Sequence, residues 1–400
     1  MPGRARARLF TRTFLALAVA ELAYSTAANG LAIYALPLYV TGPLGGNDAL
    51  AGFSVGAFAL SALLLRPVAG RLTDQMGRRP LLLGGALLGA VCLALLAFAH
   101  SLVAVVAIRL VAGVAEAAFF VAGFAALADI APPDRLGEAL SYNSLGLYLG
   151  IALGPPLAEA LIGAGGFRTA WLAGAGLAAL AAVIIAFVGE TRTAPPPVGA
   201  VARYVHRPAL PASLGFLTSI VAIGGFSAFA SLHASRIGLE NPSLALFVYG
   251  GTVVICRIAF ARVPDRLPPL ALGVASLGVM ALGLVTMAVW QHPVGLLTGA
   301  VVLGVGVTFS TPAFFSAVFA TAAPSERGAA SGTASAALDL GLGVGPILLG
   351  VVASAQGIPW AFVTGAAVAV GGAGWTFLLL LRARGATPAA RERDTTPPQA

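Results

Sequence analysis

Three carboxylates fall in the middle of long apolar stretches of the sequence, where a charged side chain is costly. They are Glu21, Glu116 and Asp339. A carboxyl group in a low-dielectric environment favours its neutral form, so it can bind a proton on one side of a membrane and release it on the other. This chemistry suits proton coupling. The alternative is that each is a neutral, hydrogen-bonded carboxyl group that packs helices together.

One of these carboxylates shares its apolar stretch with an arginine. Arg109 is followed by Gly113 and Glu116, and steps of four and seven residues place all three on one helix face. An unpaired arginine at the centre of a membrane helix costs about 2.5–3.5 kcal/mol. We therefore expect a partner or a water-filled cavity beside Arg109, with Glu116 as the nearest candidate partner. A purely structural arginine–glutamate pair is the alternative.

The elements that must position these groups are membrane-spanning helices. Of the 400 residues, 58% are hydrophobic and only 10% are charged, which is too little charge to cover the surface of a soluble enzyme. A spanning helix needs about 20 apolar residues, and breaks at charged or Pro/Gly-rich segments leave about twelve such stretches. They begin near Thr13, Asn47, Pro80, Ser101, Glu138, Phe167, Pro208, Ser243, Pro268, Pro293, Gly328 and Ile358.

The distribution of arginine predicts the orientation of these helices. All 23 basic residues are arginine, and the net charge is +8. Eighteen arginines fall in the two termini and in alternate loops, whereas the opposite loops carry only Arg168 and Arg236. Positive charge is retained on the cytoplasmic side, so we expect both termini in the cytoplasm and a multi-pass protein of a bacterial inner membrane. The arginines form no stripe with interleaved aromatic residues, which argues against nucleic acid as a partner.

The sequence contains an internal repeat at an offset of 191 residues. Arg66, Arg71 and Asp74 fall on Arg257, Arg262 and Asp265, and Gly154-Pro155 falls on Gly345-Pro346. The fold class predicted is an all-α integral membrane protein with twelve transmembrane helices in two six-helix repeats. The expected domains are a cytoplasmic N-terminus (1–12), an N-terminal half (13–190), a cytoplasmic linker (191–207), a C-terminal half (208–382) and a disordered cytoplasmic tail (383–400).

A polar motif follows the second apolar stretch. Its sequence is Gly70-Arg71-Leu72-Thr73-Asp74-Gln75-Met76-Gly77-Arg78-Arg79, with Arg66 ahead of it. It resembles the signature loop of the major facilitator superfamily, although Gln75 stands where that family usually has a basic residue. The resemblance implies that Arg66, Gly70, Arg71, Asp74, Gly77, Arg78 and Arg79 form a gating latch that holds the cytoplasmic side shut in the outward-open state. Gly70 would allow close helix approach, and Gly77 would allow a tight turn. A loop that only sets topology is the alternative.

Two further segments resemble motifs of the same superfamily. The stretch around Arg109 is similar to its helix-4 motif, whose arginine is implicated in proton transfer, and Glu21 resembles the helix-1 acidic residue of several multidrug members. Gly146, Gly150, Gly154 and Pro155 resemble the helix-5 motif of its antiporters. Glycines at four-residue spacing also form ordinary close helix contacts, so simple packing remains the alternative.

These features together predict a secondary active transporter that is not an enzyme. We expect proton-coupled efflux, by antiport, of a small lipophilic or drug-like molecule by a monomer without cofactor or metal. The chain has no lysine and so cannot form the usual nucleotide-binding loop of ATP-driven transporters. Uptake or facilitated diffusion of a sugar or organic acid, and a transport-dead sensor or assembly factor, remain alternatives. The residues expected at a midplane substrate site are Glu21, Tyr24, Asn29, Tyr34, Phe226 and Phe229.

Overall fold

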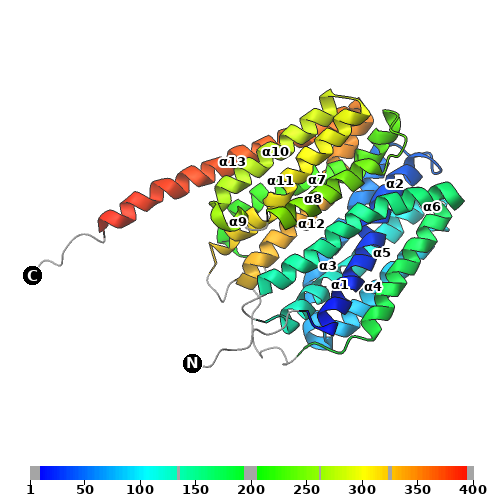
Figure 1. The fold of residues 1–400 in the computed structure, drawn as a ribbon, viewed down its shortest axis with the longest axis horizontal. Coiled ribbons are helices and arrows are strands. Elements are labelled where there is room, and N and C mark those ends of the chain that lie inside the picture. The colour runs from blue at the N-terminus through cyan, green and yellow to red at the C-terminus, as the bar shows by residue number, and fades with distance from the viewer. Residues whose placement is uncertain (1–9, 133–135, 193–204, 261–262, 323–326, 394–400) are drawn as a thin grey trace, which may run out of the picture.

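The computed structural model describes residues 10–132, 136–192, 205–260, 263–322 and 327–393, and every regular element in these ranges is a helix. The long helices lie side by side in two adjoining groups (Figure 1). The N-terminal group comprises the helices of residues 12–186, and the C-terminal group comprises those from residue 207 onward. The predicted N-terminal residues 1–9 and linker residues 193–204 lie outside the described part of the chain.

The N-terminal group begins with one 30-residue span that contains a change of helix type. Its three parts are α1 (Arg12–Ser25), the π-helix η1 (Thr26–Leu31) and α2 (Ala32–Thr41). Helices α3 (Asp48–Met76), α4 (Arg78–Leu96), α5 (Leu102–Ile130) and α6 (Leu136–Ala186) follow. The side chains of Asn47 and Ser101 accept hydrogen bonds from the first turns of α3 and α5, so N-caps fix both starts.

Helix α6 is a long element interrupted by two glycines. Gly165 and Gly166 leave the helical conformation, and Gly166 adopts a φ of 74°, which a residue with a side chain rarely adopts. The break lies just before Phe167, where the sequence predicts a new helix. The backbone stays helical through Pro155 and Pro156, so the proline pair does not end the helix.

The C-terminal group has the same kind of helices, several of which start at a proline. It contains η3 (Arg207–Ala209), α7 (Leu210–Arg236), α8 (Leu244–Ala259), α9 (Val263–Arg266), α10 (Pro269–Val289), α11 (Pro293–Phe319), α12 (Arg327–Gln356) and α13 (Ile358–Arg393). Proline is favoured in a first turn because the N–H group that it lacks has no helical partner there.

Ten helices in the described ranges are long and apolar enough to cross a membrane, and the interrupted segment Ser144–Ala186 is one of them. Helix α8 is apolar but has only 16 residues. Many large apolar side chains on these helices are exposed, for example Leu64, Ile255 and Val289. Such surfaces are stable against lipid and not against water, so the chain is a multi-pass membrane protein.

The last helix is longer than the sequence predicts. Helix α13 continues through residues 383–393 and projects beyond the bundle (Figure 1), so the prediction of a disordered tail is wrong for these residues. Alanine and arginine dominate this segment and both favour helix. Residues 394–400 lie outside the described ranges.

The two groups meet through α3 with α12, α6 with α8 and α2 with α7. Glycines bring the backbones together at the first of these contacts. A Cβ atom at Gly52 would overlap the backbone of Pro346, and one at Gly56 would overlap that of Gly343. Within the N-terminal group, Gly154 lies equally close to Gly30. Small residues therefore set both the contact between the groups and the packing inside one group.

Candidate functional site

A buried ion pair joins the two helix groups. Nη2 of Arg66 on α3 donates a hydrogen bond of 2.7 Å to Oδ1 of Asp339 on α12, and Nε of Arg66 contacts Oδ2. The side chains are only 14% and 3% exposed. The guanidinium group also lies over the ring of Phe120 on α5, 4.2 Å from its centroid. Removing either partner would leave the other charge buried and unpaired, which is strongly destabilising.

A second polar cluster lies within the N-terminal group. Glu116 on α5 lies beside Tyr24 on α1, with which it lines a small cavity, and within reach of Asn29 in η1. The cluster therefore contains three of the residues predicted from the sequence. Asn29 lies in the π-helical segment, a feature that occurs frequently at functional sites.

Arg109 does not pair directly with Glu116 in the described structure, in contrast to the prediction. Its Nε donates to the backbone oxygen of Ser54 at 3.3 Å, and its guanidinium group covers the ring of Phe58 at 4.3 Å. Both Arg109 and Glu116 line a cavity of about 20 Å³, together with Tyr24 and Phe58. A cavity of this size can hold one water molecule, so the two groups can communicate through solvent.

Glu21 lies on the same helix as Tyr24 but faces α6. Oγ of Ser25 donates a 2.8 Å hydrogen bond to Oε1 of Glu21. Gly146 on α6 lies beside it, since a Cβ atom there would be 3.5 Å from Cγ of Glu21. The glycine motif of α6 thus makes room for the backbone of η1 at Gly154, whereas the contact of Gly146 with Glu21 is of ordinary van der Waals length.

The end of the bundle where α3 begins, here called the far end, is closed by two polar links between the groups. Arg236 at the end of α7 binds Asp48 at the start of α3 with two hydrogen bonds, of 2.7 and 2.6 Å. Glu159 on α6 accepts a bond of 3.1 Å from Tyr34 and one of 2.5 Å from the hydroxyl group of Ser243. Tyr34, which was predicted at the substrate site, therefore takes part in the polar contacts that close the far end.

Sequence reasoning missed this closure for a physical reason. An acidic residue in the first turn of a helix is ordinarily explained by the helix dipole. The sequence around Asp48 therefore does not indicate that Asp48 pairs with Arg236, 188 positions away. Glu159 lies shortly before the break of α6 at Gly165, where no local pattern indicates a contact with the other group.

The two predicted phenylalanines of the substrate site are not in the polar region. Phe226 and Phe229 on α7 are completely buried, and the ring of Phe226 lies 5.1 Å from that of Tyr249. In this conformation they are part of the core of the C-terminal group. An apolar helix gives no periodic signal that separates its core face from a cavity face.

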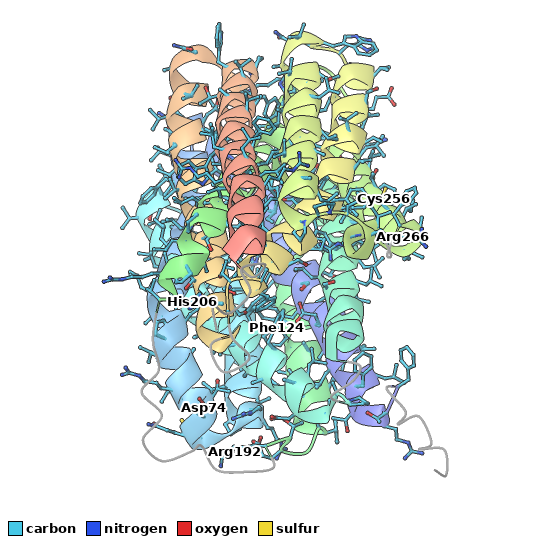
Figure 2. All side chains as sticks on the ribbon, turned by 90° about the vertical axis from the view of Figure 1, so that its left-hand side faces the viewer. Asp74, Phe124, Arg192, His206, Cys256 and Arg266 are labelled. Carbon is cyan, nitrogen blue, oxygen red and sulfur yellow. The ribbon has the colours of Figure 1, made fainter. Side chains whose placement is uncertain are left out.

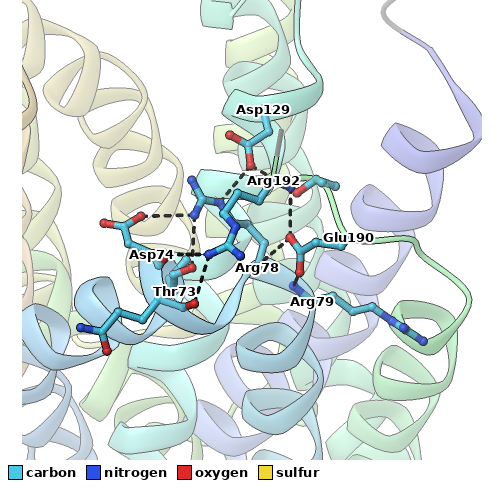
Figure 3. A network of polar contacts seen from close by, with 9 residues as sticks. Thr73, Asp74, Arg78, Arg79, Asp129, Glu190 and Arg192 are labelled. Atoms are coloured by element: carbon cyan, nitrogen blue, oxygen red, sulfur yellow. Dashed lines mark hydrogen bonds and ion pairs between the residues drawn. The ribbon is translucent and has the colours of Figure 1, made fainter. Parts of the chain in front are cut away.

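The signature-like residues 70–79 lie at the opposite end of the bundle, here called the motif end. Figure 2 shows Asp74 and Arg192 close together there. Nε of Arg78 pairs with Asp129 at 2.9 Å, and Nη1 of Arg78 contacts Asp74 at 3.2 Å (Figure 3). The side chain of Asp74 is 58% exposed, so its ion pair contributes little. These contacts tie α3, α4 and α5 to one another within the N-terminal group.

Residues after α6 complete this network, and no sequence pattern distinguishes them. Oε1 of Glu190 accepts hydrogen bonds of 3.0 Å from the backbone N–H groups of Arg78 and Arg192, and Oε2 accepts one of 3.2 Å from that of Arg79 (Figure 3). Nη1 of Arg192 donates to the backbone oxygens of Asp74 and Gln75. Because Gln75 takes part through its backbone, the loss of the usual basic side chain does not disturb this contact.

The two glycines of the motif have different environments. Gly77 has a φ of 103°, and a Cβ atom there would overlap the carboxylate of Glu190, so the predicted tight turn is confirmed. Gly70 has no atom within 4 Å of where its Cβ would be. The expectation that Gly70 permits a close helix approach is wrong for this conformation. Arg71 and Arg79 are exposed, and Arg79 donates to the backbone oxygen of Ala186 at 2.6 Å.

Comparison with known proteins identifies the family. The model of the Major Facilitator Superfamily matches residues 14–322 and, in a second overlapping match, residues 273–400. The chain belongs to the major facilitator superfamily. It is therefore a membrane transporter of that type, with a role in transport rather than catalysis.

Individual superfamily members resemble the chain over most of its length. It is 30% identical over 370 residues to an uncharacterized MFS-type transporter of Burkholderia pseudomallei, with 88% of each chain covered. It is 29% identical over 364 residues to an uncharacterized MFS-type transporter of Salmonella typhimurium, covering 88% of this chain and 92% of the relative. The crystal structure of a POT family transporter in complex with a thioalcohol-conjugated peptide superposes with a TM-score of 0.79 at 12% identity, covering 94% of this chain and 96% of that one. This last likeness concerns the fold alone.

The contacts of Glu190 predict a pH-dependent contribution to the stability of this major facilitator. Partial burial acts to raise the pKa of Glu190, but the N–H groups of Arg192, Arg78, Arg79 and Thr191 outweigh it and hold the pKa below its ordinary value of 4.5. A lowered pKa means that the stabilisation is complete above pH 4.5 and is lost as the pH falls through the lowered value.

We therefore expect Glu190→Gln to lower the free energy of unfolding at pH 7 by about 0.5–2 kcal/mol, as for loss of a helix N-cap. The difference from wild type should shrink as the pH is lowered below 4.5. Thermal unfolding of the purified wild-type protein and of the variant, in detergent at several pH values, measures this difference in stability. Glu240→Gln, in an exposed turn, is the matched control. Equal melting temperatures of Glu190→Gln and wild type at pH 7 would contradict the prediction.

Proposed function

We propose that this transporter is a proton-coupled antiporter that exports a small, lipophilic or drug-like molecule by alternating access. The observation that carries the proposal is the buried Arg66–Asp339 pair between the two groups. Protonation of Asp339 would remove the negative charge that holds Arg66. A single proton would then weaken a contact between the groups, which is what coupling of protons to alternating access requires.

The proposed architecture is twelve spans in two six-helix repeats. Helix α6 supplies two spans on either side of Gly165 and Gly166, and α8 is a short span of the second repeat. Residues 13–190 and 208–382 form the halves, joined by the linker 191–207, and the protein acts as a monomer. Arginine at the motif end favours a cytoplasmic position for that end and for both termini. The closed far end then faces outward.

The proposed proton pathway uses Glu21, Glu116 and Asp339, with Arg109 near Glu116 across the small cavity. Glu116 lies in the network of Tyr24 and Asn29, and these residues with Glu21 form the N-terminal side of the substrate site. Tyr34, Phe226 and Phe229 reach a substrate only in another conformation. A membrane potential of 100 mV supplies about 2.3 kcal/mol per charge, which sustains a concentration ratio of tens.

Residues 66–79 are proposed to latch the motif end when the far end opens. Gly146, Gly150, Gly154 and Pro155 support the antiport direction through their resemblance to the antiporter motif, and two of them, Gly150 and Gly154, pack tightly against α1 and η1. Uptake or facilitated diffusion by the same fold is the competing function.

Transport in proteoliposomes tests the proposal. The protein is reconstituted with a pH-sensitive dye inside, the interior is made acidic, and lipophilic cations, organic anions, neutral antibiotics and sugars are added in turn. We expect at least one lipophilic compound to dissipate the gradient through the wild-type protein and not through Asp339→Asn. Glu240→Gln should behave as wild type. Equilibration of a labelled sugar or acid without any effect on the pH gradient would replace antiport with facilitated diffusion.

A further inference from the structure

One arginine between the two groups has no carboxylate partner among the described residues. Arg257 on α8 reaches α6 of the N-terminal group. Its Nη1 donates to Oγ of Ser144 at 3.2 Å and its Nη2 to the hydroxyl group of Tyr148 at 3.4 Å. The guanidinium carbon lies 4.4 Å from the centroid of the Tyr148 ring. The buried Nε atom has no hydrogen-bond partner in the described part of the chain.

The internal repeat shows what is different about this contact. At the offset of 191 residues, Arg257 corresponds to Arg66, and Tyr148 corresponds to Asp339. Both arginines reach across to the other group, from α3 to α12 and from α8 to α6. One of these equivalent contacts is an ion pair and the other is not. The position that holds a carboxylate beside Arg66 holds an uncharged phenol beside Arg257.

The contacts of Arg257 are weak for a partly buried guanidinium group. Charge-assisted hydrogen bonds to anions are about 2.7–2.9 Å long, whereas both bonds of Arg257 are longer and go to neutral hydroxyl groups. A guanidinium group offers five N–H donors in a planar fork that matches a carboxylate or phosphonate. Arg257 and Tyr148 are both only partly buried, so their neighbours do not seal off either side chain.

We propose that Arg257 and the hydroxyl group of Tyr148 bind an anionic group of the transported molecule. The substrate class is then an organic anion, with a carboxylate, phosphonate or sulfonate group on an apolar body. The substrate supplies at Arg257 the negative charge that Asp339 supplies at Arg66. This inference rests on the proposed transport function and narrows its substrate class.

Equilibrium binding without any gradient tests this site. Isothermal titration calorimetry on the full-length protein in detergent uses benzoate, benzenesulfonate and phenylphosphonate as probes, with benzyltrimethylammonium and benzyl alcohol as the matched cation and neutral compound. We expect at least one of the anions to bind more tightly than either matched compound. Arg257→Gln should weaken its binding by about 10- to 100-fold, as expected for lost hydrogen bonds to a charged group.

Three further variants separate recognition from folding. Arg257→Lys keeps the charge but not the fork and should bind with intermediate affinity, and Tyr148→Phe keeps the ring but should weaken binding a few-fold. Arg168→Gln is the matched control, because Arg168 also covers an aromatic ring, that of Phe98 at 5.0 Å, but is exposed. It should bind as wild type does.

Three results would overturn the anion site: a wild-type protein that binds none of the anions, tighter binding of the cation, or unchanged anion affinity in folded Arg257→Lys and Tyr148→Phe. These outcomes do not depend on proton coupling. Anion binding that survives while pH-driven exchange fails would instead overturn the proposed antiport alone.

Discussion

Asp339→Asn is expected to destabilise the protein by about 3–5 kcal/mol, the range for removing one partner of a buried ion pair. The asparagine removes the negative charge that pairs with the buried guanidinium group of Arg66, which also lies over the ring of Phe120. Arg66→Gln should cost less, because an unpaired carboxyl group can become neutral by binding a proton, whereas a guanidinium group cannot. The difference between Arg66→Gln and wild type should therefore shrink at acidic pH.

The double variant Arg66→Gln/Asp339→Asn decides whether the pair itself matters. Since it leaves no unpaired charge, we expect it to be more stable than Asp339→Asn but inactive in pH-driven transport. Thermal unfolding and the proteoliposome assay measure the two properties. Asp74→Asn is the matched control for stability alone, since it removes an aspartate whose pair with Arg78 is exposed and should cost at most about 1 kcal/mol. Equal losses of stability in Asp339→Asn and Asp74→Asn would show that the buried pair has no special role.

Gly154→Ala and Gly52→Ala should both create backbone overlaps but should have different consequences. A methyl group at Gly154 meets Gly30 within the N-terminal group, where no rigid-body motion can relieve it. We expect a loss of about 1–3 kcal/mol of stability, as for overpacking. A methyl group at Gly52 meets Pro346 of the other group. The groups can relieve this overlap by separating at the far end, so Gly52→Ala should shift the conformational equilibrium instead.

Distances between spin labels measure that shift. Labels at Pro43→Cys and Glu240→Cys lie on exposed positions of the two groups near the far end, and Cys92 and Cys256 are buried. The distance distribution should lengthen in Gly52→Ala and stay unchanged in the control Gly176→Ala, whose new methyl group meets no atom within 4 Å. An unchanged distribution in Gly52→Ala, together with a loss of stability equal to that of Gly154→Ala, would contradict this interpretation.

The helices could be predicted from the sequence because their signals are local. Runs of about 20 apolar residues mark the spans, and N-caps such as Asn47 and Ser101 or first-turn prolines such as Pro293 mark their starts. The break before Phe167 was equally visible, since two adjacent glycines precede it. The extension of α13 was missed because charge and proline were read as disorder, while the alanine and arginine residues there favour helix.

The candidate site could be predicted only in part. The costly charges Glu21, Arg109, Glu116 and Asp339 stand out because the membrane penalises each of them individually. Their partners do not stand out. Arg109 pairs with a backbone oxygen and a phenylalanine ring, and neither is distinctive in a chain with 21 phenylalanines. Glu190 could not be selected from the sequence, because it accepts hydrogen bonds from backbone N–H groups, which do not depend on a particular partner side chain.

The sequence by itself determined the membrane class, the family, most helix starts and several of the buried charges, because apolar runs, caps and short motifs act within a few residues of one another. Only the tertiary structure decided how the charges pair. The Arg66–Asp339 bond joins residues 273 positions apart, and the closure at Asp48 and Arg236 joins residues 188 apart. Such contacts depend on how the two helix groups pack against each other. Close backbone contacts at glycines set that packing, and the residues that these glycines contact cannot be read from neighbouring positions in the sequence.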